Sequence, residues 1–256
     1  MNGCLIIFSF IIIIIIYILN ITSQEKFTNT SNITIVSGYW NVKNKNDNKY
    51  DTWFNNSLKI NQRYIFFCEE NNIEYIKKFR NNYETIFIVH PLNSFYSAKY
   101  ANDEWIVPVH VPSKELGMIW NEKMNLLKLA KDYDIKNNTS TDFYMWIDAG
   151  ICTYRNKLPP QQKLELKNIN MLPHDKICYS LVNNIVAGGD ILMHKNIIDN
   201  IFNIYYNELQ NCNIKNTLCG SDQEIFTIIK NKHPELFYQI GSDWGQTLKI
   251  LYNKYI

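Results

Sequence analysis

Residues 143–150 read FYMWIDAG and indicate the class of fold more clearly than any other part of the chain. Five apolar residues without polar alternation are typical of a strand that is buried on both faces of a parallel sheet. The strand ends at Asp148, and the small residues Ala149 and Gly150 then allow a ligand to approach the backbone. Ligands of open α/β sheets bind outside the carboxyl ends of the strands, so Asp148 is placed to contact a metal ion or a phosphate. A turn-forming aspartate before Gly150 gives the same pattern.

Short apolar runs alternate with helical patterns on both sides of this segment. Further strands are predicted at residues 33–36, 64–68, 86–89, 177–182 and 191–193, and helices at residues 53–60, 72–80, 113–132 and 196–210. An alternation of strands and helices is typical of a three-layer α/β domain with a largely parallel sheet. The sequence therefore predicts one such domain over residues 33–256.

The chain begins with a long apolar segment, CLIIFSFIIIIIIYIL at residues 4–19, which carries no charge. Its length is slightly below the roughly 17 to 25 residues that span a bilayer, and neighbouring residues extend it. No Lys or Arg precedes it and Ile21-Thr22-Ser23 is a poor cleavage site, which favours a transmembrane signal anchor over 1–22 rather than a cleaved signal peptide. A polar stem follows at 23–32. Six Asn-x-Ser/Thr sequons fit a type II protein whose main domain is lumenal or extracellular.

Charge and cysteine content exclude several classes of protein. The 26 Lys and Arg residues are scattered among 24 Asp and Glu residues, so no basic surface argues for a nucleic-acid partner. The six cysteines are too few for a disulfide scaffold, although Cys212 and Cys219 are close enough in sequence to close one small loop. The absence of Cys-x-x-Cys and His-Glu-x-x-His motifs leaves a zinc site unsupported.

A lysine lies on the apolar stripe of the predicted helix 113–132. That stripe consists of Leu116, Trp120, Leu127 and Ala130, and Lys123 falls on it. A lysine among core-facing residues either extends to the rim of the core or meets an anion. Its partner would then be Asp148 or a diphosphate, and the pattern leaves these alternatives open.

Two further segments place polar or small residues where a ligand could bind. Gly188 and Gly189 precede the strand 191–193 and permit close approach of a sugar or base, although a plain tight turn has the same composition. Ser221 and Glu224 form a predicted capping box at the start of a helix. The capping box does not account for Gln223 and accounts only partly for Asp222. Both residues lie at the start of the helix, where a carboxylate can face sugar hydroxyls.

In their order along the chain, these segments resemble the HtrL/YibB family. They read TIVSGY at 34–39, WNEK at 120–123, WIDAG at 146–150, Gly-Gly at 188–189 and Asp-Gln at 222–223, and the resemblance extends over about residues 33–245. That family in turn resembles glycosyltransferases of the GT-A fold, which is Rossmann-like. The resemblance implies a nucleotide-sugar donor that is bound by Val36, Ser37, Gly38, Tyr39, Lys123, Trp146, Asp148, Ala149, Gly150, Gly188, Gly189 and Gln223.

The same resemblance implies a divalent cation, Mn²⁺ or Mg²⁺, held by Asp148. The family motif usually has two aspartates, whereas the second acidic position here is Gly150. A metal ion held by one carboxylate needs further oxygen or imidazole ligands, for which His233 and Asp243 are candidates.

We therefore expect transfer of a sugar to a hydroxyl of a glycan or glycoprotein acceptor. Asp222 would be the catalytic base in an inverting enzyme and would orient the donor in a retaining one. The alternative is a non-catalytic, membrane-anchored ectodomain that binds a carbohydrate or a partner. A nucleotide-dependent oxidoreductase is disfavoured because no Gly-x-Gly-x-x-Gly follows the first predicted strand.

Overall fold

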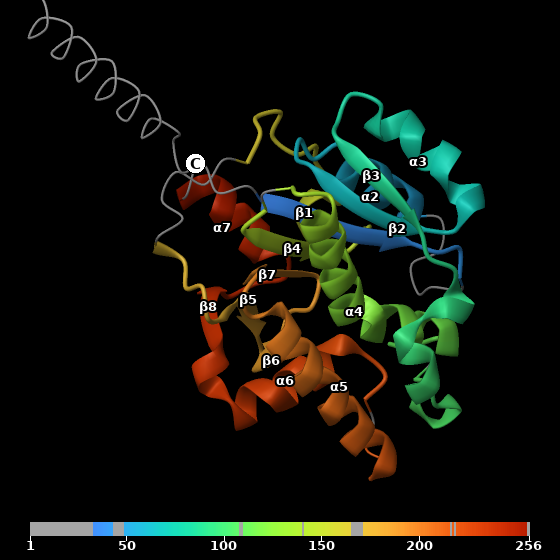
Figure 1. Cartoon of the computed structure of the whole chain (residues 1–256), viewed down its shortest axis with the longest axis vertical. Helices are drawn as coiled ribbons and strands as arrows, with labels where there is room; N and C mark the ends of the chain where they lie inside the picture. Colours follow the sequence, from blue (N-terminus) through green and yellow to red (C-terminus); the bar gives the residue numbers. More distant parts are fainter. Residues whose placement is uncertain are drawn as a thin grey trace, which may run out of the picture. The chain divides into compact units, whose positions relative to one another are not determined.

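A mixed β-sheet forms the centre of the fold, with β4 (Phe143–Ile147) near its middle (Figure 1). The computed structural model describes residues 33–42, 49–107, 110–139, 141–164, 171–215, 217 and 219–254. The predicted anchor at 1–22 and stem at 23–32 lie outside these residues. Among the residues that the structure describes, no helix combines the length and the apolar character that a membrane span requires.

The sheet has the strand order β3-β2-β1-β4-β7-β5-β6, and β8 pairs with β5. The strands are β1 (Ile33–Tyr39), β2 (Tyr64–Cys68), β3 (Thr85–Val89), β5 (Ile177–Val182), β6 (Ile185–Val186), β7 (Asp190–His194) and β8 (Phe237–Gly241). Strands β3, β2, β1 and β4 are parallel to one another. Their carboxyl ends therefore lie at one edge, as the sequence predicts.

The expectation of a largely parallel sheet is wrong for the second half of the domain. Strand β7 runs antiparallel to β4 and to β5, and β6 runs antiparallel to β5. The cause is a tight hairpin between β5 and β6, where Asn183 and Asn184 adopt φ values of 49° and 64°. Two consecutive residues with positive φ form the turn that suits a two-residue hairpin, and asparagine tolerates this conformation well.

The direction of β7 has a direct consequence for the candidate site. In the antiparallel register Ile147 pairs with Asp190, so β7 begins where β4 ends. The backbone N–H of Asp148 donates to the carbonyl oxygen of Gly189 at 2.8 Å. The glycine pair and the strand-end aspartate therefore lie side by side.

Helices cover both faces of the sheet (Figure 1). The α-helices are α2 (Lys49–Ser57), α3 (Ile73–Arg80), α4 (Lys114–Lys136), α5 (Ile198–Ile214), α6 (Asp222–Lys232) and α7 (Gln246–Lys254). Short 3₁₀ helices span Glu70–Asn72, Leu92–Ser94, Tyr96–Tyr100, Asp103–Trp105, Cys152–Tyr154 and Pro234–Leu236. Residues of α4, α5 and α6 pack on one face, and residues of α2, α3 and α7 pack on the other.

Strand β4 contributes to both halves of the core, as its continuous apolar run predicts. Tyr144 and Trp146 pack with α4, α5 and α6, whereas Phe143, Met145 and Ile147 pack with α2, α3 and α7. All five side chains are buried. The described residues thus form a three-layer α/β domain in which each helical layer has its own apolar cluster.

Each predicted strand is present, and the four predicted helices are found with shifted ends. Strands β6 and β8 and helix α7 were not predicted. Cys212 and Cys219, which are close enough in sequence to close a small loop, are both free and buried in the structure.

Candidate functional site

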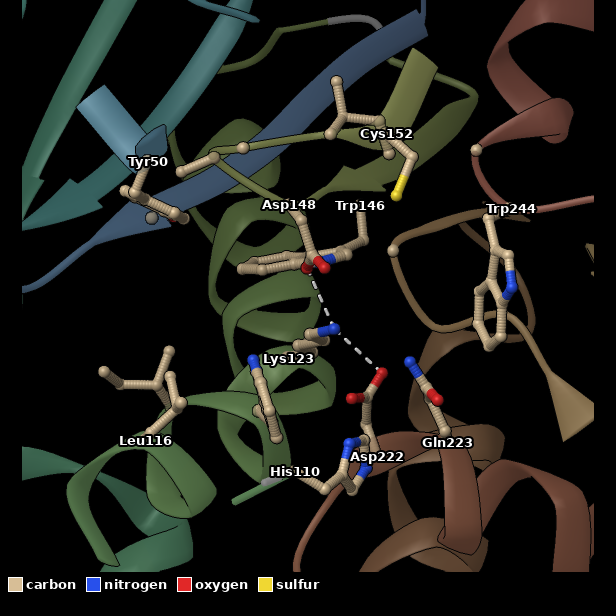
Figure 2. Close-up of a pocket in the computed structure, with 18 of the residues that line it drawn as sticks. Tyr50, His110, Leu116, Lys123, Trp146, Asp148, Cys152, Asp222, Gln223 and Trp244 are labelled. Atoms are coloured by element: carbon tan, nitrogen blue, oxygen red, sulfur yellow. Dashed lines mark hydrogen bonds and ion pairs between the residues drawn. The ribbon is translucent and has the colours of Figure 1, made fainter. Parts of the chain in front are cut away.

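A cavity of about 880 Å³ opens at the carboxyl ends of β1 and β4 (Figure 2). Its volume is within the range of roughly 300 to 1,000 Å³ that is typical of small-molecule sites. The wall is rich in aromatic rings, contributed by Tyr39, Trp40, Tyr50, Trp120, Trp146 and Trp244. Charged and polar side chains converge on it as well, namely His110, Lys123, Asp148, Arg155, Asp222, Gln223 and Glu224.

A buried lysine links the two carboxylates of the cavity. The ammonium nitrogen of Lys123 lies 2.9 Å from Asp148 Oδ1 and 2.9 Å from Asp222 Oδ2 (Figure 2). It also donates to the carbonyl oxygen of Gly188 at 2.9 Å. A lysine has three N–H donors, so Lys123 has one for each of these oxygens. Of the alternatives left open for Lys123, the ion pair with Asp148 is confirmed.

The position of Lys123 follows from the way α4 packs on the sheet. The helix begins after Ser113, whose side chain accepts a hydrogen bond from the N–H of Leu116 at 3.2 Å. The Lys123 side chain is only 2% exposed, and its ammonium lies 5.6 Å from the centre of the Trp146 ring. The electron-rich face of an indole attracts such a cation.

The charges of this cluster depend on one another. Burial alone would lower the pKa of Lys123, but the neighbouring Asp148 and Asp222 carboxylates outweigh it and raise this pKa. Burial raises the pKa of Asp222 to about 6, while the attraction of Lys123 opposes that rise. Lys123 is therefore a cation at neutral pH, and Asp222 exchanges its proton close to neutrality, where a general base is most effective.

Asp148 is held by its own strand and remains accessible. Trp146 Nε1 donates to Asp148 Oδ1 at 2.8 Å. The Asp148 side chain is 36% exposed and lines the cavity. Since Oδ1 is shared between Lys123 and Trp146, Oδ2 is the oxygen that can meet a ligand.

Asp222 approaches the backbone of Gly188 so closely that no larger residue fits there. A Cβ atom at position 188 would lie 1.8 Å from Asp222 Oδ2. The capping box that was predicted for α6 is present, and Ser221 N–H donates to Glu224 Oε2 at 2.6 Å. Asp222, in the first turn of the helix, is 1% exposed.

Most residues that the sequence analysis assigned to the donor site line the cavity. They are Gly38, Tyr39, Lys123, Trp146, Asp148, Ala149, Gly150, Gly189 and Gln223, and the predicted catalytic residue Asp222 lines the cavity as well. Val36 and Ser37 lie instead within the sheet, where Ser37 Oγ donates to the carbonyl oxygen of Ile147 at 2.7 Å. Gly188 contributes its carbonyl oxygen to Lys123 and is not part of the cavity wall.

Several cavity residues were missed by sequence reasoning. Tyr50, His110, Arg155 and Trp244 line the wall from α2 and from three segments outside the regular elements. Arg155 stacks its guanidinium 3.9 Å from the centre of the Trp53 ring. The motif Asp-Trp-Gly at 243–245 is the one signal that could have placed Trp244 in a turn, since both aspartate and glycine are typical turn residues.

The candidate metal ligands fit a divalent cation only in part. Among the described residues, no three His, Cys, Asp or Glu side chains are grouped so that they could hold a metal ion. The two further candidate ligands, His233 and Asp243, are not part of the cavity wall, and His233 pairs with Glu235 at 3.4 Å. Magnesium ions are often bound by one or two carboxylates together with substrate phosphates, and Asp148 can supply one such oxygen.

The comparisons with known proteins show a fold and no closer relationship. No family model matches the chain, and no curated protein matches it. The crystal structure of mouse xyloside xylosyltransferase 1, apo form, is similar with a TM-score of 0.51 at 12% identity, covering 82% of this chain and 84% of that chain. A 4-diphosphocytidyl-2C-methyl-D-erythritol synthase from Anaerococcus prevotii DSM 20548 has a TM-score of 0.40 at 8% identity over 88% of this chain and 95% of that chain. This TM-score is too low to assign a fold. The domain therefore has a GT-A-like fold.

Proposed function

We propose that this chain is a glycosyltransferase that moves a sugar from a nucleotide-sugar donor to an acceptor hydroxyl. The observation that carries the proposal is the Lys123 ammonium, held at 2.9 Å by both Asp148 and Asp222 in a cavity of about 880 Å³. The GT-A-like fold and the name of its xylosyltransferase neighbour support this class of reaction. The HtrL/YibB resemblance and a type II membrane anchor over 1–22 are part of the same proposal.

The donor would lie with its nucleotide against the aromatic residues at the end of β1. Tyr39 and Tyr50 line that part of the cavity, and their rings are stacked with centres 6.4 Å apart. Arg155 lines the same cavity and offers a guanidinium, which binds phosphate oxygens well. The diphosphate would therefore lie between Arg155 and the strand end at Asp148.

In the transfer step, the acceptor oxygen attacks the anomeric carbon while the bond to the diphosphate oxygen breaks. If the enzyme inverts, Asp222 accepts the proton of the acceptor hydroxyl; if it retains, Asp222 orients the donor sugar. Lys123 holds Asp222 in place and offsets negative charge near the leaving group. A divalent cation that arrives with the diphosphate would be held by Asp148 and would supply further charge neutralisation.

The test is release of free nucleoside diphosphate from a panel of UDP-, GDP- and CDP-linked sugars in the presence of glycan acceptors. Wild-type protein is expected to release nucleotide from one donor. Asp222→Asn and Asp148→Asn should abolish release while the protein remains folded, as measured by circular dichroism. Asp132→Asn is the matched control, because Asp132 forms a partly exposed pair with Lys128 outside the cavity wall, and it should keep full activity.

The pH dependence gives a second readout. An inverting enzyme needs ionised Asp222, so kcat/KM should rise with pH and level off above about 6, the pKa to which burial raises this carboxyl. Donor binding without turnover would support the alternative, a non-catalytic carbohydrate-binding domain. No binding and no turnover with every donor would contradict the proposal.

A further inference from the structure

The cavity extends to two sides of the Lys123, Asp148 and Asp222 cluster. In Figure 2, Tyr50 and Trp244 lie on opposite sides of this cluster, and Gln223 lies on the same side as Trp244. The side with Tyr50 is the one that the proposed nucleotide would occupy. The side with Trp244 and Gln223 is therefore left for the second substrate.

Trp244 presents a large apolar surface to this side of the cavity. Its side chain lines the cavity and the residue is 39% exposed. A tryptophan contributes one of the largest apolar surfaces of any residue, so its exposure in a concave site marks a place where another flat surface can bind. Ile185, at the start of β6, is 40% exposed and extends the apolar surface of the same cavity.

The backbone holds Trp244 in a defined position. Trp244 lies in the turn between β8 and α7, where Gly245 has a φ of 67°. Thr153 Oγ1 donates to the carbonyl oxygen of Gly245, and a Cβ atom at position 245 would lie 2.5 Å from that hydroxyl. The N–H of Trp244 donates to Asp243 Oδ1 at 2.8 Å. A backbone turn that is fixed before the ligand arrives loses little conformational entropy on binding.

The chemistry of this side of the cavity suits a sugar ring. One face of a pyranose presents C–H groups with partial positive charge, and the face of an indole ring is negative. Gln223, on the same side of the cluster, offers both a hydrogen-bond donor and an acceptor, which suit hydroxyl groups. We infer that Trp244 is the stacking platform of an acceptor subsite for a pyranose, with one sugar hydroxyl directed toward Asp222. The inference rests on the proposed function and defines the acceptor as a carbohydrate rather than a serine or threonine of a protein.

The experiment is saturation-transfer NMR with methyl glycosides of glucose, galactose, mannose, xylose and N-acetylglucosamine. Each is added to the full chain in the presence of the nucleoside diphosphate that binds best among UDP, GDP and CDP. We expect saturation at the C–H groups of one face of one glycoside. Trp244→Ala should weaken glycoside binding about tenfold, and Trp244→Phe should retain most of it. Tyr238→Ala is the matched control, since Tyr238 is an aromatic residue of β8 that is 40% exposed and lies outside the cavity wall.

The two parts of the account fail in different ways. Unchanged glycoside binding by Trp244→Ala overturns the acceptor subsite. Binding of a nucleoside diphosphate without binding of any glycoside also overturns it, and leaves the donor site in place. Failure of all three nucleoside diphosphates to bind overturns the subsite together with the proposed function. Nucleoside diphosphate binding must remain unchanged in Trp244→Ala for the loss of glycoside binding to count.

Discussion

Replacement of Lys123 by methionine removes the cation that the site is built around. Methionine keeps a long side chain but leaves the carboxylates of Asp148 and Asp222 without the ammonium that lies 2.9 Å from each. Breaking a buried ion pair by removal of one partner costs about 3 to 5 kcal/mol, because the remaining charge is buried without compensation. We expect Lys123→Met to lower the free energy of unfolding by this amount at pH 8, as measured by urea denaturation.

The loss of unfolding free energy in Lys123→Met should depend on pH, because it depends on the ionisation of Asp222. Lys123 opposes the rise in the pKa of Asp222, so its removal moves that pKa above the present value of about 6. For a carboxyl group with a raised pKa in the folded state, protonation stabilises the fold, and this stability is lost as pH rises through the folded pKa. The destabilisation by Lys123→Met should therefore be smaller at pH 5 than at pH 8, by up to about 1.4 kcal/mol per pH unit.

A matched lysine and a double variant complete the test. Lys128 lies on the same helix and forms a partly exposed pair with Asp132, so Lys128→Met should cost only about 0.2 to 1 kcal/mol. Lys123→Met combined with Asp222→Asn should be less destabilised than Lys123→Met alone, because one of the uncompensated charges is gone. Equal costs for the two lysine substitutions, or a cost at Lys123 that is the same at pH 5 and pH 8, would refute the reasoning.

Three further predictions concern neighbouring residues. Gly188→Ala should abolish nucleotide release, because its Cβ would lie 1.8 Å from Asp222 Oδ2, whereas Gly189→Ala, with a Cβ 3.3 Å from the nearest atom, should retain some activity. Arg155→Gln should raise KM for the donor about 10- to 100-fold with a smaller effect on kcat, since a charged hydrogen bond contributes about 1.5 to 3 kcal/mol; an unchanged KM removes Arg155 from the donor site. Burial raises the pKa of Asp190 to about 8, whereas the pKa of an aspartate in the unfolded chain is near 4. Between pH 4 and pH 8 this carboxyl therefore lowers the free energy of unfolding by about 1.4 kcal/mol per pH unit. Asp190→Asn should remove that slope in urea denaturation, and an unchanged slope would show that another group causes it.

Sequence reasoning was most successful where a local pattern determines the position of a residue. The apolar run before Asp148 defines a buried strand and its end, and the capping box before Asp222 defines the start of a helix. The stripe of α4 shows that Lys123 faces the core. Each of these features is determined by residues within one strand or within a few helical turns, so it can be predicted from the local sequence.

The convergence of these residues could not be predicted in the same way. It depends on the antiparallel course of β7, which brings the Gly188 carbonyl oxygen and Asp148 to the same ammonium group. That course follows from the hairpin at Asn183 and Asn184, whose positive φ values are a property of a two-residue turn and not of an apolar pattern. Trp244 was missed because β8 and α7 are short and their apolar patterns are weak.

The most direct test of the central claim is a structure of this chain with an intact nucleotide sugar bound. The account predicts that the diphosphate lies in the cavity between Arg155 and Asp148, that the anomeric carbon faces Asp222, and that Lys123 remains paired with Asp222. A donor bound outside this cavity, or bound with its sugar directed away from Asp222, would contradict the account.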